Sequence, residues 1–424
     1  MHAILASLGT DGDVLPFVGL GVALRARGHR VTVLASEGYG ELVAAHWLEF
    51  RTLVSAEAMR ALLGNADFWH PLKTARFTAK WGAALIEPQY RLLSELARDP
   101  DAIFVTNPAI LAAMLVHEKT GRQLATVVLQ PWMIPSASAP PIMPIIGLPL
   151  WAPRISHRFF FRVIDLAADL LFGPTLNRFR RSLGLKPMRR ILRNWFSRDL
   201  VLGMFPEWYG PPQSDWPQQI KLTGFPFFDG ALNRSLPPGL HEFLANPKPT
   251  ILFTFGSGMM HGPQLFELAT RVCAALKVQG LFVNRFQSPT TPPHIFHASF
   301  VPFKDVFPRC AAIVHHGGIG TVAEAFAAGK PQFILPLGFD QLDNGVRVKH
   351  LGGGLHAPSK HALVAKTSLP EQEIQKICQA VAMLLQPASA ASAAKLALRI
   401  RSENGLETAA VKLEEFEANK AIVA

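Results

Sequence analysis

The amino-acid sequence predicts an α/β protein made of two doubly wound, Rossmann-like domains. In both halves of the chain, short apolar runs of strand length alternate with segments of helical periodicity, which is typical of a parallel sheet covered by helices. The length of 424 residues suits two to three ordinary domains, and a hydrophobic content of 49% provides sizeable cores. Proline, glycine and polar residues gather over 211–236, which we expect to link an N-terminal domain (1–210) to a C-terminal domain (237–424).

Each element follows from an apolar run and from the residues that end it. In the first half we expect strands at residues 2–8, 30–35, 102–106 and 124–129, and helices at 16–27, which Gly28 ends, and at 108–119. In the second half we expect strands at 250–255, 280–284, 311–314 and 332–337, and a helix at 321–328, which Gly329 and Pro331 end. A helix at the C-terminus could return to the N-terminal domain.

The segment 311–344 organises the second half of the chain. An apolar strand over 311–314 leads into a turn of sequence His-His-Gly-Gly-Ile-Gly-Thr, and the turn leads into an alanine-rich helix. Glycines let the backbone approach a ligand closely, and the free amides at a helix N-terminus attract negative charge. The sequence therefore predicts a phosphate or diphosphate site at this turn, formed by the backbone of Gly317, Gly318 and Gly320.

Side chains around this turn extend the prediction to a nucleotide sugar. His316 and Thr321 can donate hydrogen bonds to phosphate oxygens, and Glu324, about two helical turns beyond His316, can accept from ribose hydroxyls. Asp340 and Gln341 follow the next strand at the same edge of the sheet, and their polar groups suit sugar hydroxyls. A lone histidine or an Asp-Gln pair is more often structural, so the combination rather than any single residue carries the prediction.

This arrangement resembles the donor-binding signature of nucleotide-sugar glycosyltransferases with the GT-B fold, in the branch of the UDP-glycosyltransferase superfamily that modifies lipids, sterols and antibiotics. The resemblance implies two domains that face each other across a cleft. It assigns His316 to the diphosphate, Glu324 to the ribose, and Asp340 with Gln341 to the sugar. It also implies two further pairs: Phe300 and Val301 holding the base, and Gly256 and Ser257 forming the opposite wall of the phosphate site.

The turn after the first strand, LGTDGDVLPF, carries the candidate catalytic residue. Glycosyl transfer needs a base that removes the proton of the attacking hydroxyl, and a carboxylate at the end of the first strand of a Rossmann-like sheet is well placed for this. Asp13 is our candidate, and Asp11 is the second choice. The resembling sterol and antibiotic enzymes carry the frame Gly-x-x-Gly-Asp-x-x-Pro here, and Gly9, Gly12, Asp13 and Pro16 preserve it.

Three other roles for this turn stay open. Asp13 could cap the N-terminus of the following helix, a role that is compatible with catalysis. Asp11 and Asp13 form an Asp-x-Asp pair, which binds a divalent cation in another glycosyltransferase fold, although the position directly after the first strand argues against it. A dinucleotide site is disfavoured because Gly9 and Gly12 lack the remaining glycine of the G-x-G-x-x-G fingerprint. We therefore expect neither a metal nor a cofactor beyond the nucleotide-sugar donor.

The chain is strongly basic, with a formal net charge of +11 and a pI near 9.8. Residues 151–199 concentrate this charge and interleave arginines with aromatic residues such as Phe159, Phe160, Phe161 and Trp195. This composition favours the surface of an anionic membrane, but a solvated helical face with ordinary packing aromatics explains it equally well. No nucleic-acid motif accompanies the charge, so we expect no nucleic-acid partner.

A proline-rich apolar stretch over 131–151 follows a predicted strand of the N-terminal domain. Loops at that edge of the sheet would line the acceptor side of the site, and an apolar lining that contains methionine suits a lipid or polyketide. A loop that packs on its own domain is the alternative. The candidate acceptor-lining residues are Gly12, Trp132, Met133, Ile142 and Met143.

Two longer segments, 1–20 and 215–230, are similar to the rhamnosyltransferases that make rhamnolipids. This similarity implies inverting, metal-independent transfer from dTDP-L-rhamnose to a hydroxyalkanoyl lipid. A glucosyltransferase that uses UDP-glucose on a sterol or polyketide-like alcohol is the alternative. Two further alternatives are a nonhydrolysing sugar epimerase, whose acid and base residues the sequence does not reveal, and a non-catalytic activator, which would have lost donor-site residues such as His316.

The cysteine pattern and the N-terminus bear on the compartment. The three cysteines, Cys273, Cys310 and Cys378, are scattered and odd in number, so we expect a reducing compartment and no disulfide framework. Residues 1–8 lack the basic start and the length of a signal peptide. The uncharged run 123–153 contains too many prolines to cross a bilayer as a helix. We therefore expect a cytoplasmic protein, with peripheral attachment to the inner membrane surface as a further expectation.

Overall fold

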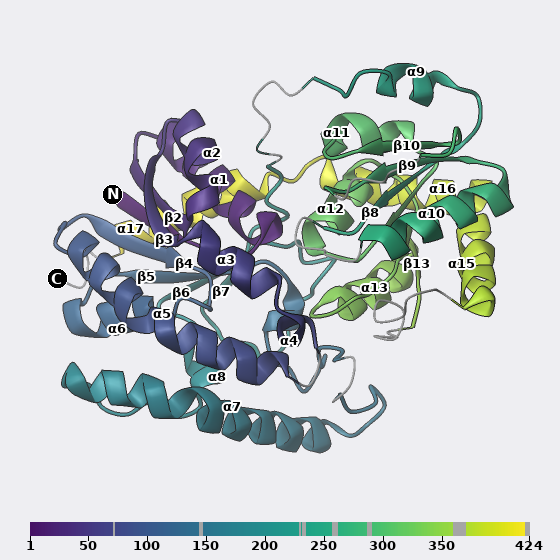
Figure 1. Ribbon diagram of the computed structural model, residues 1–424. Helices are drawn as coiled ribbons and strands as arrows, with labels where there is room; N and C mark the ends of the chain where they lie inside the picture. Colours follow the sequence, from purple (N-terminus) through teal and green to yellow (C-terminus); the bar gives the residue numbers. More distant parts are fainter. Residues whose placement is uncertain are drawn as a thin grey trace. The chain divides into compact units, whose positions relative to one another are not determined.

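The computed structural model describes residues 1–70, 73–143, 147–228, 230, 235–256, 262–285, 291–358 and 370–419 (Figure 1). The chain divides into two compact units, and each is considered by itself. Unit 1 comprises Met1–Pro141, Gly147–Gly230 and Asn404–Ala424, and unit 2 comprises Ile142–Ile146 and Ala231–Glu403. Within the described residues, no single helix is both long and apolar enough to span a membrane, although the bent pair Glu371–Leu384 and Pro387–Ala418 passes by length and composition.

Unit 1 contains a parallel sheet whose strand order is β3-β2-β1-β4-β5-β6-β7. The strands are β1 (His2–Ala6), β2 (Arg30–Ser36), β3 (Glu49–Val54), β4 (Ala102–Thr106), β5 (Leu124–Val128), β6 (Leu200–Gly203) and β7 (Ile220–Leu222). The central strands β1, β4 and β5 are buried throughout, as expected for a sheet covered on both faces. The chain reverses its direction of winding between β1 and β4, which is where ligands of such sheets bind.

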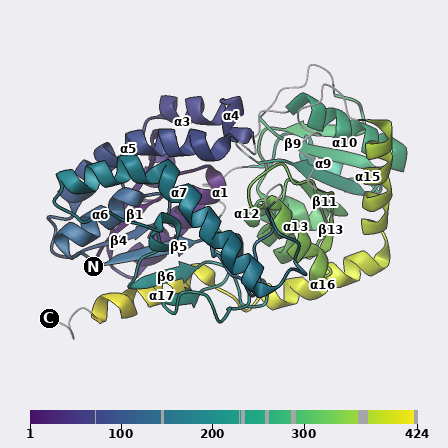
Figure 2. The same ribbon diagram turned by 90° about the horizontal axis from the view of Figure 1, so that it is seen from below.

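Helices cover both faces of this sheet, and a further layer lies outside them. The helices of unit 1 are α1 (Asp11–Ala26), α2 (Gly40–Ala45), α3 (Ala56–Leu63), α4 (Ala66–Trp69), α5 (Thr74–Leu96), α6 (Leu111–Thr120), α7 (Arg154–Ser182), α8 (Ile191–Asn194) and α17 (Gly405–Ala418). Both views show α7 on the outer side of α5 (Figures 1 and 2), and Leu176 of α7 packs with Ile86 of α5 and Ile191 of α8. The long helix α7 therefore forms an outer layer that packs on α5 and α8.

The C-terminal helix α17 lies against α1 of unit 1, so the chain end returns to the first domain. Glu414 accepts hydrogen bonds from Arg27 Nε at 2.9 Å and Nη2 at 2.6 Å, and it pairs with His29 Nε2 at 2.8 Å. The amino group of Met1 lies 3.2 Å from Glu417 Oε1. Both charge clusters tie the end of the chain to its beginning.

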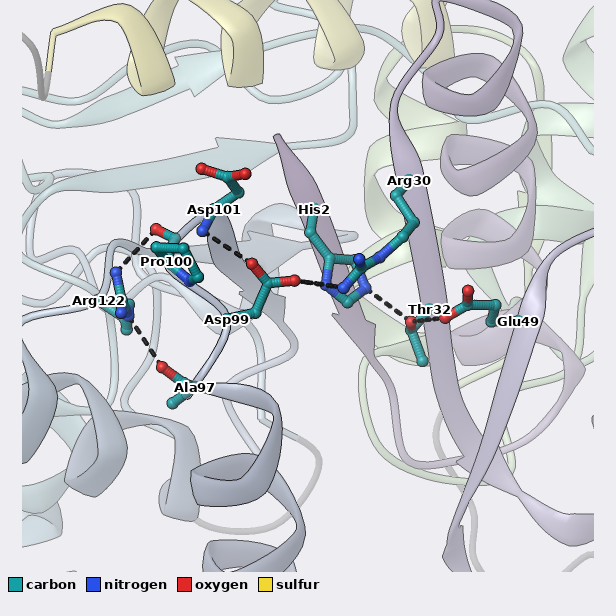
Figure 3. Close-up of polar contacts among 9 residues, drawn as sticks. All are labelled: His2, Arg30, Thr32, Glu49, Ala97, Asp99, Pro100, Asp101 and Arg122. Atoms are coloured by element: carbon teal, nitrogen blue, oxygen red, sulfur yellow. Dashed lines mark hydrogen bonds and ion pairs between the residues drawn. The ribbon is translucent and has the colours of Figure 1, made fainter.

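A polar network joins the amino ends of the strands in unit 1 (Figure 3). His2 Nδ1 contacts Asp99 Oδ2 at 2.8 Å, His2 Nε2 contacts Thr32 Oγ1 at 2.8 Å, and Arg30 also pairs with Asp99. Thr32 Oγ1 donates onward to Glu49 Oε2 at 2.7 Å. The pKa of His2 is lowered by burial, and the Asp101 backbone amide holds the pKa of Asp99 below its usual value. This network fixes β1, β2 and β3 at the edge opposite to their carboxyl ends.

Unit 2 repeats the architecture with strand order β10-β9-β8-β11-β12-β13. Its strands are β8 (Thr250–Thr254), β9 (Gln279–Val283), β10 (Ile295–Ala298), β11 (Ala312–His315), β12 (Gln332–Ile334) and β13 (Gly354–His356). Its helices are α9 (Leu240–Ala245), α10 (Gly262–Leu276), α11 (Phe303–Val306), α12 (Ile319–Ala327), α13 (Gln341–His350), α15 (Glu371–Leu384) and α16 (Pro387–Ile400). Every strand pair is parallel, and the winding reverses between β8 and β11. The predicted pair of doubly wound sheets is therefore present.

The structure corrects several predicted boundaries. The predicted linker 211–236 contains β7, which pairs in register with β6, so its first part belongs to the sheet of unit 1. The helix predicted at 16–27 spans Asp11–Ala26, because Thr10 caps it and Pro16 lies inside it instead of at its start. The strand predicted at 332–337 ends at Ile334, because the amides of Leu337 and Gly338 bond to a side chain instead of to a neighbouring strand.

Candidate active site

The candidate site of unit 1 is the turn between β1 and α1. Asp13 lies in the first turn of α1, and its Oδ2 accepts hydrogen bonds from the Thr10 amide at 2.9 Å and from Thr10 Oγ1 at 3.4 Å. Ser7 Oγ donates to the Asp13 carbonyl at 2.8 Å, and Asn107 Nδ2, just after β4, donates to Ser7 Oγ at 3.3 Å. Thr10 is the N-cap residue of α1, and the Asp13 carboxylate at position N3 accepts from the Thr10 amide, so Asp13 contributes to the capping box without being the N-cap itself.

The environment of Asp13 makes it a stronger base than an ordinary aspartate. The side chain is half-buried, and burial, together with the negative charge of Asp11, raises its pKa to about 6, although the Thr10 hydrogen bonds oppose the shift. A carboxylate with this pKa is mostly ionised at pH 7 and still holds a proton well. The second candidate, Asp11, instead accepts a hydrogen bond from the Tyr39 hydroxyl at 2.7 Å. The geometry therefore favours Asp13 as the proton acceptor.

Gly9 is the residue that permits this close turn. Its φ is +146°, and a Cβ placed there would overlap the Asp13 carboxyl group. We expect Gly9→Ala to displace Asp13 and to lower kcat by roughly tenfold or more, since small misplacements of a reacting group are costly. Steady-state kinetics measures the loss, with Gly82→Ala, where a Cβ meets nothing within 4 Å, as the matched control. Equal kcat for the two variants would contradict the positioning role of Gly9.

The candidate site of unit 2 is the glycine-rich turn between β11 and α12. Gly318 caps α12, so the first amides of that helix, including that of Thr321, have no helical partner. Gly256 follows β8 across the switch point, and a Cβ there would lie 3.1 Å from His316 Nε2. A Cβ at Gly318 would lie 2.5 Å from the same atom. Backbone from two loops therefore closes around His316, and Ser257 lies outside the described residues.

His316 is a neutral hydrogen-bonding group at pH 7. Burial lowers its pKa to about 4, and a hydrogen bond to the Thr254 backbone opposes the shift. Its Nδ1 is a buried nitrogen that has no hydrogen-bond partner among the residues described by the structure. Buried polar atoms nearly always have a partner, so this nitrogen fits a site that a polar ligand completes. In the tautomer that carries the proton on Nδ1, this nitrogen can donate to a phosphate oxygen, and with the amides of α12 it forms a cradle suited to a diphosphate.

Two residues that the sequence analysis did not single out hold this turn in place. His315 is fully buried, and its Nδ1 accepts from the Gly317 amide at 3.2 Å while its Nε2 donates to Gln332 Oε1 at 3.0 Å. Asn344 Nδ2 donates to the Gly317 carbonyl at 2.9 Å and to Asp340 Oδ2 at 2.6 Å. Asn344 thus couples the phosphate turn to Asp340. A fully buried histidine directly before the glycines was the available signal for His315.

The predicted sugar-binding pair sits at the start of α13. Asp340 is the residue before the helix, beside Asn344. Gln341 is buried, and its Oε1 accepts from the amides of Leu337 at 2.7 Å and Gly338 at 2.9 Å, which leaves its Nε2 as the group suited to a sugar hydroxyl. Gln341 therefore holds the loop between β12 and α13 in place through its Oε1.

The predicted ribose and base contacts lie on the same edge of the sheet of unit 2. Glu324 is half-buried in α12, on the helix that carries the phosphate turn. Phe300 and Val301 follow β10, and Phe300 is partly exposed, with 36% of its surface accessible. Val301 is only 1% exposed and packs with Leu252 and Ile313, so only its backbone suits a base. Phe300 is accordingly the stacking candidate of this pair.

The candidate acceptor-lining residues do not form one group. Gly12 lies in α1, and Trp132 and Met133 lie in the short helix η2 (Pro131–Met133) after β5, all in unit 1. Ile142 and Met143 group with unit 2 instead, where the Ile142 amide donates to Asp343 Oδ1 at 2.9 Å. Between them, Ser136 Oγ and the Ala137 amide bind Asp215 at 2.7 Å each, which packs this part of the loop on unit 1. The sequence could not reveal that the loop divides in this way.

Two histidines whose pKa is lowered by burial, His315 and His316, predict a loss of stability in acid. Folding lowers the pKa of His316 to about 4 and that of His315 to about 3, whereas both have ordinary values near 6.5 when unfolded. Below pH 6.5 the unfolded chain binds protons that the folded chain does not, so stability falls as pH drops from 6.5 toward 4. Asp13 has the opposite effect on stability between pH 6 and 4, because its raised pKa lets the folded chain bind a proton that the unfolded chain does not.

We expect each histidine to cost about 1–2 kcal/mol of unfolding free energy at pH 5 relative to pH 7. Urea unfolding of the wild type and of His316→Asn at both pH values measures the difference. The variant should lose less stability than the wild type. If the wild type and His316→Asn lose the same free energy of unfolding between pH 7 and pH 5, His316 is not buried in its neutral form.

Comparisons with known proteins agree with both halves of the structure. Residues 3–138 match the glycosyltransferase family 28 N-terminal domain, and residues 282–414 match the erythromycin biosynthesis protein CIII-like C-terminal domain. The chain is 27% identical to O-mycaminosyltylonolide 6-deoxyallosyltransferase of Streptomyces fradiae, over 98% of this chain and 97% of that protein. It is 25% identical to the sterol 3-beta-glucosyltransferase of Eremothecium gossypii, over 87% of this chain but only 31% of that protein's length.

Solved structures show the same fold. The glycotransferase of kitacinnamycin superposes with a TM-score of 0.71 at 19% identity, covering 98% of both chains. The spinosyn rhamnosyltransferase SpnG gives a TM-score of 0.68 at 18% identity, covering 99% of this chain and all of that one. VinC, solved in complex with dTDP, gives 0.66 at 19% identity with the same coverage.

The chain is a glycosyltransferase with the GT-B fold, as the sequence predicted. Its N-terminal domain is of the family 28 type, and its C-terminal domain is of the erythromycin CIII type.

Proposed function

We propose that this chain transfers a hexosyl group from a dTDP- or UDP-sugar to a hydroxyl group of a lipophilic acceptor, with inversion at the anomeric carbon. The observation that carries the proposal is the cradle of unit 2, where neutral His316, the N-terminus of α12 and the glycines around them suit a diphosphate. Glu324, Asp340 and Gln341 border that cradle and suit ribose and sugar hydroxyls. Phe300 is suited to stack on the base.

In this mechanism, Asp13 accepts the proton of the acceptor hydroxyl as its oxygen attacks the anomeric carbon. The bond from that carbon to the diphosphate oxygen breaks on the opposite face, so the configuration inverts. The amides of α12 and His316 stabilise the negative charge that gathers on the departing diphosphate, which is usually the largest catalytic term in such sites. His315 and Asn344 are positioning residues, because they act through the Gly317 backbone.

We propose dTDP-L-rhamnose as the donor and a hydroxyalkanoyl lipid as the acceptor. The similarity of segments 1–20 and 215–230 to rhamnolipid rhamnosyltransferases supports this choice, and so do structural relatives named for rhamnosyl transfer or solved with dTDP. Transfer of glucose from UDP-glucose to a sterol or polyketide-like alcohol is the second candidate, since sterol glucosyltransferases are among the relatives. A non-catalytic activator is disfavoured because His316, Glu324, Asp340 and Gln341 are all present.

The proposal is tested by incubating the purified chain with each donor and with a hydroxyalkanoyl lipid or a sterol. Mass spectrometry should detect a rhamnosylated lipid with the dTDP donor, and proton NMR of the product should show inverted anomeric configuration. Glucosylated sterol alone would replace the first candidate by the second. Retained configuration with either donor would contradict the inverting mechanism and the role of Asp13 as a base.

We also propose that the transfer needs no metal ion and takes place in the cytoplasm, at the inner membrane surface. In this proposal, the amides of α12 and His316 stabilise the diphosphate in place of a cation. The three cysteines are free thiols, which suits a reducing compartment. Activity should survive dialysis against EDTA, and loss of activity that Mg²⁺ restores would contradict the proposal.

A further inference from the structure

We propose that the outer face of α7 is a docking surface for an anionic phospholipid bilayer. This surface, called here the α7 face, consists of exposed apolar side chains on α7 and on the segment before it: Leu150, Trp151, Ile155, Phe159, Leu166 and Leu170. Trp151 is 85% exposed and Phe159 is 66% exposed. Their spacing on the helix is four, seven and four residues from Ile155 to Leu170, so they form one stripe along α7.

The opposite side of α7 already provides its packing against unit 1. His157, Phe161, Ala168 and Leu176 are buried on that side, and Leu176 lies in the cluster shared with α5 and α8. The helix therefore has an apolar inner side that is covered and an apolar outer stripe that is not. Single exposed apolar residues are ordinary, but a continuous exposed stripe is typical of an interaction surface.

Arginines flank the stripe on one side. Arg154, Arg158 and Arg162 recur every four residues and are exposed. Arg158 and Arg162 also line a cavity of about 520 Å³, together with Arg190, Arg193, Phe161 and Trp216. The two carboxylates in this cavity are engaged: Asp165 pairs with Arg193 at 2.8 Å, and Asp215 accepts from Ser136 and Ala137. No ion pair to Arg158, Arg162 or Arg190 is found in the described parts of the chain.

On the other side, the stripe borders an apolar recess of about 550 Å³ lined by Leu148, Ile155, Ser156, Phe159, Phe160 and Val163. A cationic cavity and an apolar recess thus lie on the two sides of one exposed helix. This arrangement matches a phospholipid, because guanidinium groups bind the phosphate of a headgroup and the recess accommodates acyl carbons. Long arginine side chains can reach the headgroup level while the helix lies in the interface plane.

Charge and shape favour a bilayer over a protein partner. The acidic residues of α7 are both occupied, Asp165 with Arg193 and Asp169 with the amides of Arg190 and Ile191, so the outward charge of this helix is positive. The stripe runs along one face of α7 from Ile155 to Leu170, about 22 Å at 1.5 Å per residue, a length that suits an extended surface. The α7 face extends the membrane location proposed above, and it does not depend on the identity of the sugar.

Vesicle sedimentation of the full chain tests this proposal without any substrate. Wild-type protein should bind vesicles of 70% phosphatidylcholine and 30% phosphatidylglycerol, should bind pure phosphatidylcholine vesicles weakly, and should dissociate in high salt. The double variants Phe159→Glu/Leu166→Glu and Arg158→Gln/Arg162→Gln should each lower the partition coefficient by about tenfold or more. The matched controls carry the same charge change at exposed residues away from α7: Met383→Glu/Leu398→Glu, at residues 59% and 61% exposed, and Lys395→Gln/Arg401→Gln. Both controls should bind as the wild type does.

Wild-type protein that ignores phosphatidylglycerol vesicles, or α7 variants that bind as the controls do, would overturn the proposal. Light scattering adds a further test: a wild-type dimer that Phe159→Glu converts to a monomer would assign the α7 face to a second copy of the chain instead. Melting temperatures within a few degrees of the wild type establish that the variants fold. Vesicle binding without sugar transfer would defeat only the proposed function, and sugar transfer without vesicle binding would defeat only the α7 face.

Discussion

Replacing Asp13 with asparagine should lower kcat by about 10²–10⁴-fold and leave the dissociation constant of the donor nearly unchanged. The amide keeps the shape of the carboxyl group and its hydrogen bond from Thr10, but it cannot accept a proton. The donor cradle belongs to unit 2 and shares no element with the turn that holds Asp13. Steady-state kinetics and calorimetric titration of the nucleotide together separate the two effects.

The pH dependence gives an independent test of the same assignment. Because the pKa of Asp13 is raised to about 6, kcat/KM for the wild type should rise as the pH increases toward 6 and level off above pH 7. The Asn variant should lose this limb of the profile. Asp11→Asn is the matched control, since Asp11 is held by Tyr39 and should retain most of the activity. If Asp11→Asn loses most of its kcat/KM and Asp13→Asn loses little, Asp11 and not Asp13 is the catalytic base.

Replacing His316 with alanine should weaken donor binding about tenfold or more and lower kcat by about 10²–10³-fold. The imidazole is neutral, so its contribution is a directed hydrogen bond rather than an ionic attraction, and it should matter most as charge develops on the leaving diphosphate. His294→Ala is a suitable control because His294 is also half-buried in unit 2 but precedes β10, at the amino edge of the sheet. If His316→Ala binds the donor as tightly as the wild type does, His316 does not bind the diphosphate and the proposed phosphate site is contradicted.

The fold was predictable because both sheets are regular. The central strands are buried on both faces and therefore form apolar runs. These runs alternate with segments of helical periodicity, and this alternation is recognisable in the sequence. Five strands were missed: the edge strands β3, β7, β10 and β13, and β6 beside β7. β3 carries Glu49 and Arg51 and is largely exposed, so it lacks an apolar run, and β7 has only three residues in a proline-rich segment. The sequence therefore revealed the middle of each sheet better than its margins.

The candidate site was predictable where chemistry follows directly from position. Asp13, His316 and Asp340 each come directly after a strand or at the start of a helix, and the carboxyl edge of a parallel sheet gathers such residues. The supporting residues were not predictable, because their roles depend on partners far along the chain. Asn344 reaches the Gly317 carbonyl 27 residues away, and His315 reaches Gln332 17 residues away. Side-chain burial, as at Val301, likewise emerges only from the packed structure.

The most direct test of the central claim is a thermal-shift measurement of wild-type protein and His316→Ala with dTDP, UDP, dTDP-L-rhamnose and UDP-glucose. A ligand at a hundred times its Kd stabilises the folded state by about 2.7 kcal/mol, which raises the melting temperature by several degrees. We predict this rise for the wild type with the dTDP compounds and a much smaller rise for His316→Ala. No shift of the wild type with any of the four nucleotides would contradict the assignment of the β11–α12 turn as a nucleotide-sugar site.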